Sequence, residues 1–163
     1  MRGAVNDLSD TRPRMILMIG IPGSGKSTFA AARFPPGYVR ISRDVLRTRA
    51  RVANALAEAL EKRRDVVIDN TNVKRIERER FIQPAKAAGY RVTGYYLQSV
   101  VADCLRRNAQ RSGAARIPDA GVLARAGDLE MPSPEEGFDE LFYVSITEAG
   151  FAVETWRTDD EEE

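Results

Sequence analysis

The sequence predicts an α/β fold, in which helices flank a mostly parallel central sheet that ends in an antiparallel C-terminal edge. Three observations support this fold class. Short apolar runs typical of buried strands alternate with longer segments whose apolar residues recur at helical spacing. A glycine-rich turn joins the first apolar run to the first helical segment. The last two apolar runs are separated by only a few residues, as in a hairpin.

The first half of the chain is expected to contain three strands and three helices. The strands are predicted at residues 15–19, 38–42 and 66–69, and the helices at 26–33, 50–63 and 73–88. We expect Pro84 to break or kink the third helix near Gln83, because proline lacks an N–H and its ring clashes with the preceding turn. Gly89 is expected to end that helix.

The second half is expected to add three strands, at residues 91–98, 141–146 and 151–156. A helix is predicted to begin at Val101, with a basic far face, and a short helix is predicted at 119–126. Residues 111–118 and 131–137 are expected to be loops, and 147–150 a hairpin turn.

Length and composition indicate one globular domain, predicted to span residues 14–157 of the 163. Residues 1–13 are expected to be a flexible leader, and residues 158–163 a disordered acidic tail. Apolar runs are far shorter than the roughly 20 residues that a bilayer requires, and the first residues do not resemble a secretory signal. We therefore expect a cytoplasmic protein without a membrane partner.

The chain has one cysteine and no histidine. These counts exclude an internal disulfide, a cysteine-based zinc cluster and any catalysis by histidine. A group that accepts a proton near neutral pH would therefore be a carboxylate.

The net charge of +1 conceals an uneven distribution. Residues 1–116 contain 23 basic and 10 acidic side chains, whereas residues 117–163 contain 2 and 14. Such asymmetry is typical of contact with nucleic acid or of an acidic tail. Charge alone equally fits a solvated basic helix face followed by a solubilising tail.

The glycine-rich turn matches the phosphate-loop pattern G-x-x-x-x-G-K-[ST] in full. Glycines let the backbone N–H groups curl around phosphate oxygens, and the helix that follows directs its N-terminal dipole at the same anion. Lys26 would reach the β- and γ-phosphates of ATP, and the Ser27 hydroxyl would bind Mg²⁺. The alternative is a tight turn without a ligand. The expected ATP-binding residues of this turn are Gly20, Gly23, Ser24, Gly25, Lys26, Ser27 and Thr28.

Asp44 and Arg47 follow the second expected strand. Ligands of open parallel sheets bind outside the carboxyl ends of the strands, so both side chains would face the phosphate loop. Asp44 could accept the proton of an attacking hydroxyl, and Arg47 could hold an anionic substrate. The ordinary interpretation is that Asp44 caps a helix and Arg47 is a solvated helix residue.

At this point the chain resembles the kinase domain of the polynucleotide 5′-kinase family, a group of AAA-like ATP-binding kinases within the phosphate-loop phosphotransferases. Four segments carry the resemblance in order: GIPGSGKST, then ISRDVLR, then VVIDNTN with KRIERERF, and finally RNAQRSGAARIP with PSPEEGF. They span residues 15–142. The resemblance implies a phosphate-loop NTPase fold with a helical lid at about residues 106–118.

The resemblance also implies residue roles. Lys26, Asp44 and Arg111 would be catalytic, with Asp44 as the general base that activates the 5′-hydroxyl of DNA or RNA. Arg47 would hold a phosphate of the acceptor strand. Arg107 and Arg111 would bind ATP phosphates from a mobile lid, with Arg111 closing on the transferring phosphoryl group. For these arginines, a solvated basic helix end is the ordinary alternative.

A third set of implied roles falls on the end of the strand at 66–69. Asp69 resembles the Walker B carboxylate, which lies behind the Mg²⁺ ion, and Asn70 and Thr71 would contact the acceptor. The same residues could instead form an Asx turn that ends the strand.

Three functions stay open from the sequence. The first is an ATP-dependent polynucleotide 5′-hydroxyl kinase in nucleic acid repair, working beside a separate ligase or phosphatase. No D-x-D-x-[TV] run is present, so we expect no 3′-phosphatase activity in this chain. The second is a kinase for a nucleoside, sugar or antibiotic. The third is a regulatory protein that binds ATP without transferring phosphate.

Overall fold

The computed structural model describes residues 10–157. Its sheet has six strands: β1 (Arg14–Ile19), β2 (Val39–Ile41), β3 (Val66–Ile68), β4 (Arg91–Leu97), β5 (Glu140–Thr147) and β6 (Gly150–Thr155). The order across the sheet is β2-β3-β1-β4-β5-β6. All neighbouring pairs are parallel except β5 and β6, which form an antiparallel hairpin. The predicted fold class is therefore confirmed.

The helices are α1 (Lys26–Arg33), α2 (Arg43–Leu46), α3 (Arg49–Glu61), α4 (Arg75–Ala87), α5 (Val101–Ala109) and α6 (Asp119–Asp128). Two short 3₁₀ helices, η1 (Gly113–Ala115) and η2 (Pro134–Glu136), lie in segments that the sequence predicts to be loops. The sequence gives no separate expectation for α2. A four-residue helix is too short to show apolar periodicity.

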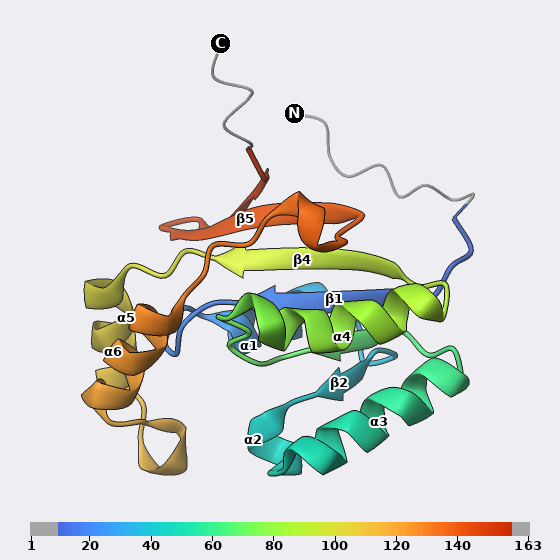
Figure 1. The fold of residues 1–163 in the computed structure, drawn as a ribbon. Helices are drawn as coiled ribbons and strands as arrows, with labels where there is room; N and C mark the ends of the chain where they lie inside the picture. The colour runs from blue at the N-terminus through green and yellow to red at the C-terminus, as the bar shows by residue number, and fades with distance from the viewer. Residues whose placement is uncertain (1–9, 158–163) are drawn as a thin grey trace.

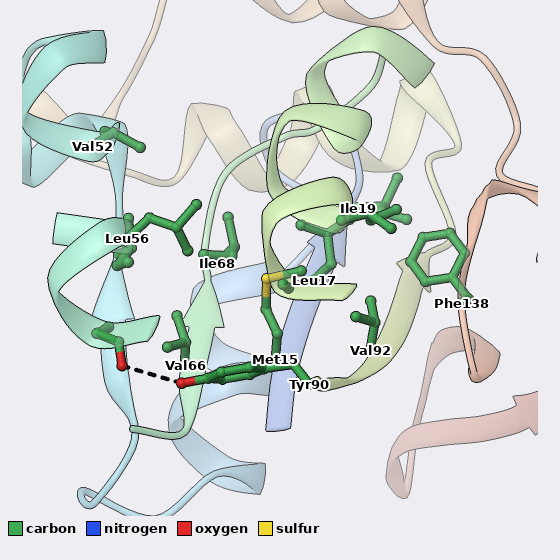
Figure 2. Close-up of a cluster of buried hydrophobic side chains, with 14 of the residues drawn as sticks. Met15, Leu17, Ile19, Val52, Leu56, Val66, Ile68, Tyr90, Val92 and Phe138 are labelled. Carbon is green, nitrogen blue, oxygen red and sulfur yellow. Dashed lines mark hydrogen bonds between the residues drawn. The ribbon is translucent and has the colours of Figure 1, made fainter. Parts of the chain in front are cut away.

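Alternating residues of β1 supply the two faces of the sheet. Met15, Leu17 and Ile19 belong to one buried cluster with side chains of α3 and α4, as Figure 2 shows for Val52 and Leu56 of α3. On the other face, Ile16 and Met18 pack with Phe29 and Ala30 of α1. This alternation is what a strand covered on both faces requires.

The expected break at Pro84 is wrong, because α4 continues through the proline to Ala87. Ile82 and Ala85 are almost completely buried in the sheet-facing cluster. Proline removes one hydrogen bond from the helix, and packing on either side of it offsets that loss.

The carboxyl ends of the parallel strands determine where a site can form. The phosphate loop follows β1, residues 42–47 follow β2, and residues 69–72 follow β3. Helices α5 and α6 lie beyond the arrow tips of β1 and β4 (Figure 1). They pack against this end through a small cluster that contains Ile21, Val73, Cys104 and Val122. The strand ends and two helices therefore enclose one region.

Part of the expected leader lies against the sheet: Asp10 pairs with Arg91 of β4 at 2.8 Å, and Pro13 accepts a backbone hydrogen bond from the same residue. The rest of the expected leader and the expected acidic tail lie outside the described residues. Within residues 10–157, no helix combines the length and apolar character needed to cross a membrane.

Candidate functional site

The phosphate loop links β1 to α1 and needs glycine at two positions. Gly23 and Gly25 have φ angles of 87° and 96°, a left-handed conformation that L-residues rarely adopt. A Cβ atom on Gly23 would also lie 2.3 Å from the carbonyl oxygen of Cys104 in α5. The loop conformation and the close approach of α5 therefore depend on Gly23.

Lys26 is the first residue of α1 and is buried. Its Nζ donates a hydrogen bond to the Ile21 carbonyl at 3.1 Å. Burial lowers the pKa of Lys26 to about 8, an effect that the Asp69 carboxylate partly opposes. A bound polyphosphate would give the Lys26 ammonium group a negatively charged partner.

Ser27 lies on the next position of α1 and its hydroxyl donates to Asp69 Oδ2 at 3.0 Å. Asp69 directly follows β3 and is 5% exposed. The same oxygen accepts from Arg40 Nε at 2.9 Å and Nη2 at 2.7 Å. Ser27, predicted to bind Mg²⁺, thus donates to Asp69, predicted to lie behind that ion. Arg40 is a site residue that the sequence reasoning missed. The feature of the sequence that could have indicated Arg40 is a charged residue in the middle of a short apolar strand.

Asp44 lies in the first turn of α2 and is exposed to the cavity described below. The helix begins after Ser42 and is anchored by Asn70, whose side-chain oxygen accepts from the backbone N–H of Arg43 at 2.7 Å. Thus Ser42, rather than Asp44, occupies the N-cap position. Arg47 ends the helix with φ 76°, a strained conformation for a residue other than glycine.

The expected lid spans the end of α5 and the segment with η1. Arg107 Nη1 donates to the Gly23 carbonyl at 3.1 Å, which ties α5 to the phosphate loop. Asn108 donates to the Ile117 carbonyl at 2.7 Å and accepts from its N–H at 3.2 Å. These two bonds close the segment between them, and Arg111 on that segment is exposed to the cavity.

Thr71 contacts a second residue that the sequence reasoning missed. Arg125 of α6 donates to the Thr71 hydroxyl at 3.1 and 2.5 Å, and pairs with Glu77 of α4 at 3.0 Å. Arg125 is one of only two basic residues after residue 116. This rarity of positive charge was the available signal, although pairing with α4 could not be read from it.

One cavity of about 1820 Å³ joins these elements. Nine of the sequence-predicted site residues line it: Lys26, Ser27, Thr28, Asp44, Arg47, Asp69, Asn70, Thr71 and Arg111. The remaining predicted residues, Gly20, Gly23, Ser24, Gly25 and Arg107, belong to the phosphate loop or contact it without lining the cavity. Within the described part of the chain, Ser24 Oγ is the one buried side-chain polar atom without a hydrogen-bond partner.

The donor set of the site resembles a magnesium site completed by a nucleotide. The described residues contain no group of three or more His, Cys, Asp or Glu side chains that could hold a metal by themselves. Mg²⁺ usually keeps several waters and binds through substrate phosphates and one or two protein oxygens. The Ser27 hydroxyl, with the Asp69 carboxylate behind it, fits that requirement.

Two curated proteins are similar in sequence. The chain is 30% identical over 147 residues to "Bifunctional polynucleotide phosphatase/kinase" of Schizosaccharomyces pombe, covering 88% of this chain and 36% of that protein. It is 32% identical over 146 residues to "Putative bifunctional polynucleotide phosphatase/kinase" of Acanthamoeba polyphaga mimivirus, covering 83% and 34%. The chain therefore spans about a third of the length of these relatives. They confirm the resemblance to polynucleotide kinases.

Solved structures confirm the fold. A gluconokinase from Sinorhizobium meliloti superposes with a TM-score of 0.58 at 22% identity, covering 83% of this chain and 84% of the other. A chain of the Pnkp1/Rnl/Hen1 RNA repair complex superposes with a TM-score of 0.62 at 22% identity, covering 76% and 46%. At these identities the likeness concerns the fold alone.

A family model described as "AAA domain" matches residues 15–129. The match includes β1 to β4, the phosphate loop and the helices up to α6. It thus contains every residue of the cavity described above. With most of its length and the whole of this cavity inside the match, the chain belongs to the AAA domain family.

Proposed function

We propose that this protein is an ATP-dependent kinase that transfers the γ-phosphate to the 5′-hydroxyl end of DNA or RNA. The observation that carries the proposal is the shared cavity. The cavity is lined both by Lys26 and Ser27 of the phosphate loop and by Asp44 and Arg47 of the segment after β2. The named relatives support the choice of a polynucleotide as acceptor.

The donor half of the site binds ATP through the phosphate loop. Backbone N–H groups of the loop and the N-terminus of α1 would surround the β-phosphate, and Lys26 would bridge the β- and γ-phosphates. Ser27 would hold Mg²⁺, with Asp69 accepting the hydroxyl proton. When bound, this ion neutralises charge on the transferring phosphoryl group.

The acceptor half carries the proton transfer. The Asp44 carboxylate accepts the proton of the 5′-hydroxyl as that oxygen forms a bond to the γ-phosphorus. The bond between the γ-phosphorus and the bridging oxygen then breaks, and ADP leaves with the electron pair. Arg111 stabilises the charge on the phosphoryl oxygens, and Arg47 holds a phosphate of the acceptor. Positioning and positive charge dominate such reactions, so an ordinary carboxylate is an adequate base.

The residues that line the cavity favour a polymer over a small metabolite as the acceptor. Besides the strand ends, the cavity is lined by apolar residues of α3 and α4, among them Ala53, Leu56 and Phe81. Arg49 and Arg80 also line the cavity. Apolar surface beside arginines suits bases and phosphates of a strand.

A small-molecule kinase is the second candidate, since the fold is shared with a gluconokinase. An ATP-binding protein without transferase activity is the third. These two candidates and the leading one predict different results in a single labelling assay.

The test is to incubate the protein with γ-labelled ATP and 5′-hydroxyl oligonucleotides of DNA and RNA, in parallel with gluconate and free nucleosides. We expect label on the oligonucleotide ends. Label only on a small acceptor would support the second candidate, and ATP binding without any transfer would support the third.

The role of Asp44 is tested in the same assay. Without its general base the reaction should slow by about 10²–10⁴-fold, so Asp44→Ala and Asp44→Asn should lose most of kcat while ATP affinity is unchanged. Asp103→Ala is the matched control, because Asp103 pairs with Arg106 on the surface of α5 and does not line the cavity. Full activity of Asp44→Ala would remove Asp44 from this role.

The relatives' names join a kinase to a phosphatase. One structural neighbour is a chain of an RNA repair complex with proteins named Rnl and Hen1. We therefore include in the proposal a ligase or phosphatase that acts on the same nucleic acid end. Pairing the purified protein with a ligase on a nicked 5′-hydroxyl duplex would test whether its product is consumed in this way.

A further inference from the structure

None of the roles described above involves Arg40. It lies at the centre of β2, opposite Val67 of β3, and its guanidinium reaches the carboxyl end of the sheet. There it donates two hydrogen bonds to Asp69 Oδ2, at 2.9 and 2.7 Å. Its side chain is 52% exposed and that of Asp69 is 2% exposed. A solvent-accessible arginine therefore covers a buried carboxylate.

The Asp69 carboxylate already has a task in the proposed reaction. For the Ser27 oxygen to bind a metal ion, the hydroxyl proton must point elsewhere, and Asp69 Oδ2 accepts it at 3.0 Å. Arg40 uses this same oxygen. One carboxylate oxygen thus connects the serine that would face the metal with an arginine that borders the cavity.

From this geometry, and resting on the proposed use of Mg·ATP, we propose that Arg40 is a positioning residue. Acting through Asp69, it sets how strongly Mg²⁺ enhances ATP binding.

The direction of the effect follows from charge. A guanidinium bonded to Asp69 reduces the negative potential that this carboxylate presents to a divalent cation. By neutralising the Asp69 carboxylate, which would otherwise repel the phosphates, the same guanidinium favours ATP in the absence of a metal. Both effects make ATP binding less dependent on Mg²⁺. Because the coupling between two ligands is reciprocal, the ratio of ATP dissociation constants without and with Mg²⁺ measures it directly.

Neighbouring arginines do not share this position. Arg43 also lines the cavity, but its Nε donates to the Arg47 carbonyl at 3.2 Å and forms no ion pair with Asp69 among the described contacts. Arg43→Gln is therefore a control that removes the same charge from the same cavity without touching the carboxylate.

The experiment is titration calorimetry of ATP in EDTA and in excess MgCl₂. We expect Arg40→Gln to increase the ratio of dissociation constants by about fivefold to tenfold relative to the unsubstituted protein. The rise should come from weaker binding in EDTA and from stronger binding with Mg²⁺. Arg40→Lys should restore part of the original ratio because it retains the charge, and Arg43→Gln should leave the ratio unchanged.

A second arm tests whether Arg40 acts through Asp69. In an Asp69→Asn background, adding Arg40→Gln should change the ratio by less than about twofold. An undiminished effect in that background would overturn the proposal, as would an unchanged ratio in Arg40→Gln alone. Arg40→Gln leaves the buried Asp69 carboxylate without its ion-pair partner, so the variant should be less stable. Thermal unfolding gives the temperature range in which it is folded, and the titrations are done within that range.

This result can be separated from the proposed function. If the unsubstituted protein binds no ATP, both the proposed function and the role of Arg40 are overturned. The protein could bind ATP and phosphorylate oligonucleotide ends while Arg40→Gln leaves the ratio of ATP dissociation constants unchanged. In that case only the role of Arg40 is overturned.

Discussion

At the scale of single residues, Lys26 shows how the protein prepares a site for an anion. An ammonium group that is buried against the phosphate loop loses hydration, and its pKa falls to about 8. In the ligand-free protein the lysine is therefore about half charged at pH 8 and mostly uncharged one pH unit higher. A polyphosphate beside it would favour the charged form and raise the pKa again.

This change predicts proton uptake on ATP binding. At pH 7 Lys26 is charged both before and after binding, so it takes up little. At pH 9 the free protein has mostly lost this proton, and binding should take up close to one, about 0.9, if the bound pKa returns to its ordinary range. Calorimetry of ATP binding in buffers of different ionisation enthalpy measures the uptake.

The matched variant for this test is Lys26→Arg, which stays charged at both pH values and so should bind ATP without the extra proton. Equal uptake in this variant and in the unsubstituted protein would assign the proton to another group.

At the scale of elements, α2 is the shortest α-helix in the described part of the chain and carries the proposed base. It has four residues and none of them is fully buried, although Leu46 packs partly buried against the hydrophobic core. Its first N–H donates to the side chain of Asn70 from the loop after β3. Sequence reasoning assigns Asn70 to acceptor binding, whereas this contact indicates that Asn70 also positions Asp44.

The contact predicts a loss of kcat in Asn70→Ala on the order of tenfold, because a small displacement of a catalytic group is costly. ATP affinity should not change, and Asn70→Asp should recover much of kcat since it keeps an acceptor oxygen. Steady-state kinetics with a fixed oligonucleotide separates the cases. A rise in the KM for the oligonucleotide with unchanged kcat would favour the acceptor-binding role alone.

Helix α4 supports the site loop through a buried arginine. Arg78 is completely buried and donates to the carbonyls of Asn72 and Val73, while its other nitrogens pair with Glu136 of η2. It thereby joins the segment after β3 to α4 and to the loop before β5.

We expect Arg78→Ala to lower the free energy of unfolding by about 3–5 kcal/mol, because it leaves a buried carboxylate without its partner. Denaturant unfolding measures this loss. Arg78→Met with Glu136→Leu should recover a large part of it, since the buried charge is then absent. The control is Arg80→Ala, which removes an exposed arginine from the same helix and should change the free energy of unfolding by less than about 0.5 kcal/mol. A loss as large at Arg80 would contradict the explanation.

At the scale of the whole molecule, the near-zero net charge is the sum of two unlike regions. The arginines that line the cavity come mostly from residues 40–111, within the basic part of the chain. Arg125 is the exception, and its charge is paired with Glu77. The cavity therefore has several arginines that, in the proposed function, would contact an acceptor strand.

This distribution predicts salt-sensitive binding of the acceptor. The affinity for a 5′-hydroxyl oligonucleotide should fall with a log–log slope of about −0.7 per phosphate contact on a single strand. Arg47→Ala should make that slope shallower by about one contact. Fluorescence anisotropy over a range of KCl concentrations provides the slopes. Arg106→Ala, an exposed arginine outside the cavity that pairs with Asp103, should retain the original slope. Equal slopes for the Arg47 and Arg106 variants would exclude Arg47 as a phosphate contact.

The sequence by itself determined the order of the strands and of the longer helices, the phosphate loop and the residues at the strand ends. These depend on local patterns: apolar periodicity, glycine spacing and chain order in a parallel sheet. The tertiary structure decided the contacts between distant segments, which those local patterns do not specify. It showed that packing carries α4 through Pro84, that Asn70 anchors α2, and that Arg40 and Arg125 reach partners 29 and 54 residues away in the chain. Such pairs depend on which strands and helices become neighbours, and long-range packing rather than local propensity sets that arrangement.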